Sequence, residues 1–216
     1  MASVTDSSAT LLATAEAPLA PAAPAERLWR WSVEKYHEMV HRGIIDEDDP
    51  VELLDGWIVE KMTKSPLHRT VTGLLREILQ RVMPAGWFVD SQDPVTLAAS
   101  EPEPDAVLVR GNRLDYLDRH PGPGDVALVA EVSDSGLSRD RILKKSIYAA
   151  AGIAVYWVVN LVDRRVEVYS GCTSSASGAD YARCDCYAVG ESVPLVVDGQ
   201  TVAKIPVGEI LPRTRV

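Results

Sequence analysis

The segment 126–132 constrains the fold more than any other, because it is apolar at every position except Glu131. A strand that is covered on both faces has such a continuous apolar run, whereas a half-exposed strand alternates apolar and polar residues. The run therefore predicts a central strand. A helix that Ser138 caps and Gly152 ends, followed by the apolar run 155–159, predicts a strand–helix–strand crossover.

Turn and capping residues predict the other elements. Ser32 before an amphipathic segment and Gly43 after it predict a helix over 33–42, and Asp55-Gly56 between two β-prone runs predicts a hairpin over 51–60. Apolar residues at helical spacing predict a long helix over 66–83. We predict further strands at 87–89, 95–97, 106–109, 166–169, 181–189, 193–197 and 202–207, and a surface excursion at 111–124.

Composition predicts one globular domain. The chain has 216 residues, of which 46% are hydrophobic and 25% charged, so it can bury a core. Residues 1–26 are mostly Ala, Pro, Ser and Thr, which predicts a flexible tail before a single domain at 27–216. No run approaches the roughly 20 apolar residues of a membrane span, and no basic signal-peptide start is present. We therefore expect a cytoplasmic protein with no membrane partner, whose three cysteines are reduced.

The charge balance weighs against one class of function. A formal net charge of −9 counts against tight nonspecific binding of nucleic acid, because such binders neutralise phosphates with a basic surface. Basic groups concentrated on one face, or a metal ion that supplies positive charge, would still allow such binding.

Two carboxylates are candidates for a site. Asp105 stands at the head of a predicted buried strand, although an aspartate there is equally compatible with a simple turn. Glu131 is more informative, since a lone carboxylate in an apolar strand is costly and is normally paired or bound to a metal. The alternative for Glu131 is a structural salt bridge to Arg139, Arg141 or Lys145.

Asp140 and Lys144 stand four residues apart, which as a bare pattern is most often a surface ion pair. Their helix directly follows the Glu131 strand, however, and can pack back over the strand end to bring Lys144 towards both acids. The backbone carbonyl of Val132 could be a further oxygen ligand. Together these groups could hold a hard divalent cation against a phosphodiester.

The residues resemble those of a known family, the PD-(D/E)XK nuclease superfamily, and within it the bacterial proteins of the Uma type that are described as restriction endonucleases. The similarity covers about 31–207, and its ordered combination is more specific than any one piece. The matching segments are Glu52-Leu53-Leu54-Asp55-Gly56, Ser65-Pro66-Leu67-His68, Pro104-Asp105, the segment 130–135, Arg139-Asp140 with Lys144 and Tyr148, and 151–160.

This resemblance implies an α/β or α+β fold: a restriction-endonuclease-like mixed central β-sheet flanked by helices, with a β-rich C-terminal extension. It implies an Mg²⁺-dependent endonuclease that acts on DNA, with Mn²⁺ as a substitute metal. Asp105 and Glu131, with the Val132 carbonyl, would be the metal ligands. The superfamily places a lysine two residues after the second acid, where this chain has Ser133, so the lysine role would fall to Lys144.

The same resemblance assigns Glu52, His68 and Asp140 to the lining of the cleft, although His68 is equally compatible with a capping or core histidine. Two other functions stay open. One is a nuclease fold that does not cleave and serves as a binding or interaction module, and the other is a metal-dependent hydrolase of a smaller phosphoester. A homodimer is a further expectation, since related nucleases dimerise to cut both strands and C-terminal edge strands could pair.

Overall fold

The computed structural model describes residues 28–46, 48–176 and 178–211, so the tail predicted at 1–26 lies outside the described residues. The chain forms helices and strands in the following order. They are α1 (Val33–His41), β1 (Val51–Leu54), β2 (Trp57–Glu60), α2 (Pro66–Val82), β3 (Trp87–Asp90), β4 (Ala106–Arg110), η1 (Arg113–Tyr116), η2 (Pro123–Asp125), β5 (Val126–Ser133), α3 (Leu137–Arg139), η3 (Asp140–Lys144), α4 (Lys145–Ala150), β6 (Val155–Asn160), β7 (Arg165–Ser175), β8 (Gly178–Ala188), β9 (Ser192–Val197), β10 (Gln200–Pro206) and α5 (Val207–Ile210).

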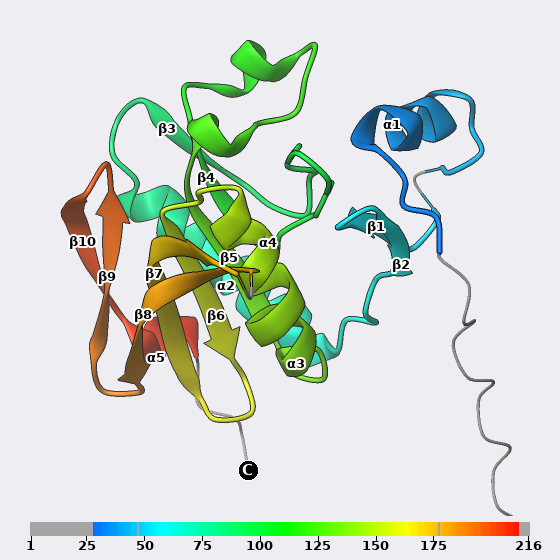
Figure 1. The fold of residues 1–216 in the computed structure, drawn as a ribbon. Helices are drawn as coiled ribbons and strands as arrows, with labels where there is room; N and C mark the ends of the chain where they lie inside the picture. Colours follow the sequence, from blue (N-terminus) through cyan, green and yellow to red (C-terminus); the bar gives the residue numbers. More distant parts are fainter. Residues whose placement is uncertain (1–27, 47, 177, 212–216) are drawn as a thin grey trace, which may run out of the picture.

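A six-stranded mixed sheet in the order β3-β4-β5-β6-β7-β8 forms the centre of the molecule. β5 and β6 are parallel and every other neighbouring pair is antiparallel. The crossover between β5 and β6 runs through α3, η3 and α4, which confirms the predicted strand–helix–strand unit. α2 lies on one face of the sheet and α3–α4 on the other (Figure 1).

Each face of the sheet has its own hydrophobic core. On the α2 side, Leu75 and Leu79 pack with Leu128 and Trp157, and the separate β9–β10 hairpin extends this core. On the α4 side, Tyr148 and Tyr156 lie in a second cluster of buried residues. Because β5 is covered on both faces, all eight of its residues are buried, as its apolar sequence predicts.

The N-terminal helix and hairpin form a smaller unit beside the sheet (Figure 1). Asp55 and Gly56 both have positive φ, at 50° and 79°, which is the backbone of the two-residue turn predicted between β1 and β2. The amide of Glu101 donates to the Leu53 carbonyl at 2.7 Å and ties this hairpin to the body. The hairpin is therefore held where β1 can contribute a side chain to the end of the main sheet.

Three details of the predicted fold are wrong. Residues 95–97 form no strand. The amides of Val95 and Thr96 donate to the carbonyls of Pro102 and Pro121, but proline has no N–H to donate in return, so a regular β-ladder cannot form. The helix after β5 starts at Leu137 rather than being capped by Ser138. The strand predicted at 181–189 is longer and belongs to the main sheet as β8, so only β9–β10 form the C-terminal extension.

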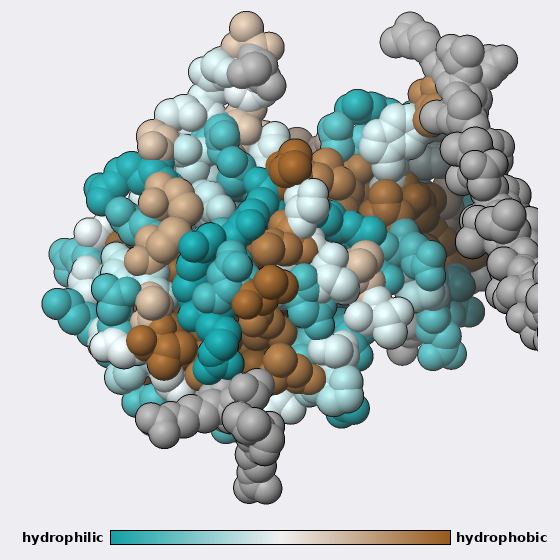
Figure 2. Space-filling model, turned by 90° about the horizontal axis from the view of Figure 1, so that it is seen from below, coloured by the Kyte–Doolittle hydropathy of each residue, from teal (hydrophilic) through white to brown (hydrophobic). Residues whose placement is uncertain are grey.

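The surface of the described residues is mixed in polarity. Figure 2 shows a hydrophilic band across the lower face of the molecule, with hydrophobic patches beside it. None of the helices among the described residues combines the length and apolar character that crossing a bilayer requires.

Candidate functional site

One cavity of about 70 Å³ collects side chains from four parts of the fold. Glu52 comes from β1, Asp105 immediately precedes β4, Glu131 lies in β5, and Lys144 ends η3. β4 and β5 pair with Ala106 opposite Ala130, so the register itself places Asp105 next to the Glu131 end of β5. A cavity of this size holds several water molecules, or a cation with part of its water shell.

A short π-helical segment turns Lys144 into the cavity. Between α3 and α4 the Lys145 amide donates to the Asp140 carbonyl, five residues back, and the Tyr156 hydroxyl donates to the same oxygen at 3.1 Å. Such wide turns inside helices often occur at functional sites. Here Asp140 and Lys144 are both buried and both line the cavity, instead of forming the exposed ion pair that their spacing alone would favour.

Asp105 is fixed by three contacts. His68, one turn into α2, places its Nε2 3.2 Å from Asp105 Oδ2, and the Val132 amide donates to the same oxygen at 2.9 Å. Gln92 donates to Oδ1 at 3.3 Å. Burial opposes ionisation of Asp105, but the hydrogen bonds from His68 and Val132 outweigh it and hold the pKa of this carboxyl below its ordinary value.

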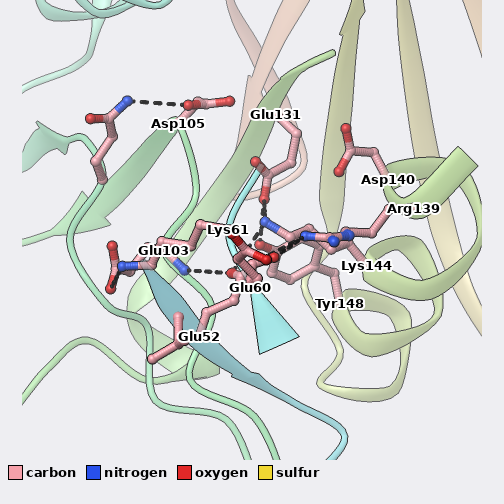
Figure 3. Close-up of polar contacts among 12 residues, drawn as sticks. Glu52, Glu60, Lys61, Glu103, Asp105, Glu131, Arg139, Asp140, Lys144 and Tyr148 are labelled. Carbon is pink, nitrogen blue, oxygen red and sulfur yellow. Dashed lines mark hydrogen bonds and ion pairs between the residues drawn. The ribbon is translucent and has the colours of Figure 1, made fainter. Parts of the chain in front are cut away.

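Lys144 joins two acids from distant parts of the chain. Its Nζ lies 3.0 Å from Glu131 Oε1 and 3.3 Å from Glu52 Oε2. The Tyr148 hydroxyl, one helical turn after Lys144, donates to Glu131 Oε1 at 2.8 Å. Figure 3 shows Glu131 pointing towards Lys144 and Tyr148, with Asp105 on the other side of Glu131.

The buried lining of the cavity has four carboxyl groups, of Glu52, Asp105, Glu131 and Asp140, against the basic groups of Lys144 and His68. Burial raises the pKa of Glu131 to about 8, since Lys144 offsets only part of the cost while Asp105, Asp140 and Glu52 add like charges. Burial also raises the pKa of Asp140. Burial opposes the charged form of Lys144, but Glu131, Glu52 and Asp140 outweigh it and raise the pKa of the ammonium, which stays charged. A bound cation would relieve the remaining repulsion.

The alternative salt bridges for Glu131 do not form. Arg141 instead pairs with buried Glu167, and Lys145 pairs with Asp180 at 2.8 Å. Arg139 lines the cavity but donates to the Glu60 carbonyl at 2.9 Å. The positive partner of Glu131 is Lys144, so the alternative of a structural pair with Arg139, Arg141 or Lys145 is not what the structure has.

The donor chemistry suits Mg²⁺. Within the described residues, no group of three His, Cys, Asp or Glu side chains is already arranged as a closed metal site. Mg²⁺ does not need one, because it keeps several waters and binds through one or two carboxylates. The cavity supplies the carboxylates of Asp105 and Glu131, and Val132 lines it. The excess of buried carboxyl groups over buried basic groups favours a hard cation there.

The structure brings every predicted site residue to this cavity: Asp105, Glu131, Val132, Lys144, Glu52, His68 and Asp140 all line it. Their roles stay predictions. The sequence interpretation missed Tyr148 and Gln92 as contacts of the two acids. Tyr148 follows Lys144 by four residues, so helix periodicity could have placed both on one side, whereas no sequence signal points to Gln92.

Comparisons with known proteins identify the family of this chain and a solved structure of similar fold. A family model named Uma2 and described as "Putative restriction endonuclease" matches residues 33–199. The chain belongs to the Uma2 family. The predicted resemblance to Uma-type proteins is therefore confirmed. A comparison with curated proteins found no match to the chain.

A solved structure has a similar fold. It is titled a "putative nuclease belonging to DUF820" from Anabaena variabilis, and it matches with a TM-score of 0.59 at 11% sequence identity, covering 83% of this chain and 96% of that one. At this identity the match concerns the fold alone. It confirms the predicted mixed sheet flanked by helices for this Uma2 protein.

Proposed function

We propose that this Uma2 protein is an Mg²⁺-dependent endonuclease that hydrolyses phosphodiester bonds of DNA. The family description and the nuclease title of the structural neighbour support a nuclease. The observation that carries the proposal is Lys144, a buried ammonium 3.0 Å from Glu131 in the cavity that Asp105 also lines. Lys144 would take the role of the lysine that the superfamily places where this chain has Ser133.

The acids and their supports would act as a unit. Asp105 and Glu131, with the Val132 carbonyl, would hold the metal. His68 fixes Asp105 and Tyr148 fixes Glu131, so neither carboxylate has to be ordered when a substrate binds. Bound Mg²⁺ would supply Lewis acidity to the scissile phosphate and lower the pKa of a coordinated water.

Lys144 would stabilise the negative charge that develops on the phosphate. A preorganised ammonium in a site of low dielectric constant is worth far more than the same charge in water. Glu52 shares Lys144 with Glu131, so it restrains the ammonium between them. The chemistry requires a protonated Lys144, and the surrounding carboxylates favour this form by raising its pKa.

Nicking of supercoiled plasmid DNA tests the proposal. We expect cleavage with Mg²⁺ or Mn²⁺ and none with EDTA. Asp105→Asn and Glu131→Gln should abolish it, and Lys144→Met should slow it on the order of 10²- to 10³-fold. The matched controls Asp118→Asn, Glu77→Gln and Lys204→Met change the same residue types at exposed positions and should cleave like the wild type.

Each other outcome points to a different function. Cleavage that persists in Asp105→Asn and Glu131→Gln would disprove the site. Hydrolysis of nucleotides or small phosphodiesters without cleavage of plasmid would identify a hydrolase of smaller phosphoesters. DNA binding without any metal-dependent hydrolysis would identify a non-cleaving binding module. Sedimentation of the same samples would test the expected homodimer.

A further inference from the structure

Positive charge is distributed unevenly along this acidic chain. Although the net charge is −9, the segment that approaches the cavity and forms α2 has five basic residues and one acidic residue. These are Lys61, Lys64, Arg69, Arg76 and Arg81, against Glu77. This segment is therefore the place to look for the concentrated basic surface that nucleic-acid binding requires.

Most arginines of the described chain are already neutralised by carboxylates. Arg81 pairs with Glu209 at 2.6 Å, and Arg110 pairs with Asp198 at 2.7 Å. Within 28–46, 48–176 and 178–211, Arg69 and Arg76 are the two arginines whose guanidinium groups form no ion pair, hydrogen bond or ring contact. Both are exposed.

The two free guanidinium groups lie on one side of α2. Residues seven apart are two turns apart, so Arg69 and Arg76 project from the same flank about 10 Å from each other. Gly73 lies between them, and a Cβ added there would meet no atom within 4 Å. Lys64, also exposed and without an ion pair among the described residues, precedes the helix and lines the cavity.

This basic flank (Lys64, Arg69 and Arg76) starts at the candidate active site. His68, adjacent to Arg69 in sequence, contacts Asp105 at 3.2 Å. A polyanion bound along the flank would therefore pass close to the cavity that Lys64 lines. Free, exposed guanidinium groups bind phosphates without first breaking an internal ion pair, which distinguishes them from the paired arginines elsewhere.

We propose that the basic flank binds the sugar-phosphate backbone of duplex DNA next to the phosphate that is cleaved. This inference rests on the proposed function for the identity of the polyanion. It explains how a protein with net charge −9 binds DNA: Arg69 and Arg76 hold the backbone along α2, and Lys64 holds it at the mouth of the cavity.

Salt-dependent binding tests the flank without any catalysis. Anisotropy of a labelled short DNA duplex in EDTA would give Kd as a function of salt for the wild type and for Arg69→Gln/Arg76→Gln. Loss of two phosphate contacts should lower the slope of log K against log[salt] by about 1.8 and weaken binding at 0.1 M salt roughly tenfold or more. Arg42→Gln/Arg183→Gln removes the same charge from exposed positions elsewhere and should leave the slope unchanged.

An unchanged slope in Arg69→Gln/Arg76→Gln, or an equal loss in the control pair, would overturn the inference. Circular dichroism would establish that both pairs fold. Hydrolysis of bis(p-nitrophenyl) phosphate, which is too small to reach α2, should be equal in the wild type and both pairs, and its loss in the Arg69/Arg76 pair alone would also contradict the assignment. If the wild type lacks metal-dependent hydrolysis, the proposed catalytic function fails, while the slope still decides the flank.

Discussion

Replacing Glu131 with glutamine should stabilise the metal-free protein, and the gain should grow with pH. Glutamine has nearly the same shape, keeps an oxygen for the Tyr148 hydroxyl and carries no charge. Wild-type Glu131 must be buried either as a carboxylate beside Asp105, Asp140 and Glu52 or as a neutral acid, and its pKa is raised from 4.5 to about 8.

The size of the effect follows from linkage. A carboxyl group whose pKa is higher in the folded protein favours folding when neutral, so its stabilisation is fully present below pH 4.5 and is lost as the pH rises to about 8. At about 1.4 kcal/mol for each pH unit well inside this window, Glu131 should cost about 2 kcal/mol of stability between pH 5.5 and pH 7. The Gln variant lacks this dependence.

Urea unfolding in EDTA at the two pH values would measure the difference. The free energy of unfolding of Glu131→Gln minus that of the wild type should increase by about 2 kcal/mol from pH 5.5 to pH 7. Any pH-independent change in the contact with Lys144 cancels in this comparison. Glu77→Gln, at an exposed position of α2, should show no such increase. A Glu131→Gln difference that is equal at both pH values would refute the argument that Glu131 is buried against an excess of like charge.

Three further predictions follow from other contacts. Tyr148→Phe removes the 2.8 Å hydrogen bond to Glu131, so denaturant unfolding should show a loss of about 1 kcal/mol, and plasmid nicking should slow. Burial of Glu167 by itself opposes ionisation, but hydrogen bonds from Arg141, Asn160 and Tyr169 lower its pKa to about 2. The stabilisation from ionised Glu167 is therefore present above about pH 4.5 and is lost as the pH falls towards 2. Glu167→Gln should remove this part of the acid sensitivity of the free energy of unfolding, as measured by urea titrations. Gly56→Ala places a Cβ 2.8 Å from Arg30 Cβ at a φ of 79°, so differential scanning calorimetry should show a lower Tm, by several degrees for a loss of about 1 kcal/mol or more.

Local sequence signals predict the parts of this fold that depend on near neighbours. The turn at Asp55-Gly56 follows from two residues that tolerate positive φ, and the burial of β5 follows from its own apolar run. The sequence predicts that Lys144 approaches Glu131, because its helix directly follows the Glu131 strand and can pack back over the strand end. The expected strand at 95–97 failed because its partner segment is interrupted by prolines, which only the tertiary pairing reveals.

These local signals do not predict contacts between residues that are far apart in the sequence. Glu52 reaches Lys144 through the docking of a hairpin that the sequence places 92 residues earlier, and His68 reaches Asp105 through the packing of α2. The direction of Lys144 depends on a π-helical turn, and the hydroxyl of Tyr156 helps to satisfy the carbonyl there. Each of these depends on packing between elements, for which a single sequence carries no periodic pattern.

The central claim is that Asp105 and Glu131 hold a divalent cation beside Lys144. Anomalous diffraction from a crystal soaked in Mn²⁺ tests it most directly. We predict an anomalous peak in the cavity, within coordination distance of both carboxylates, that disappears in the Asp105→Asn variant. Full occupancy of Mn²⁺ at a different place, or no peak between the two acids at saturating Mn²⁺, would contradict the account.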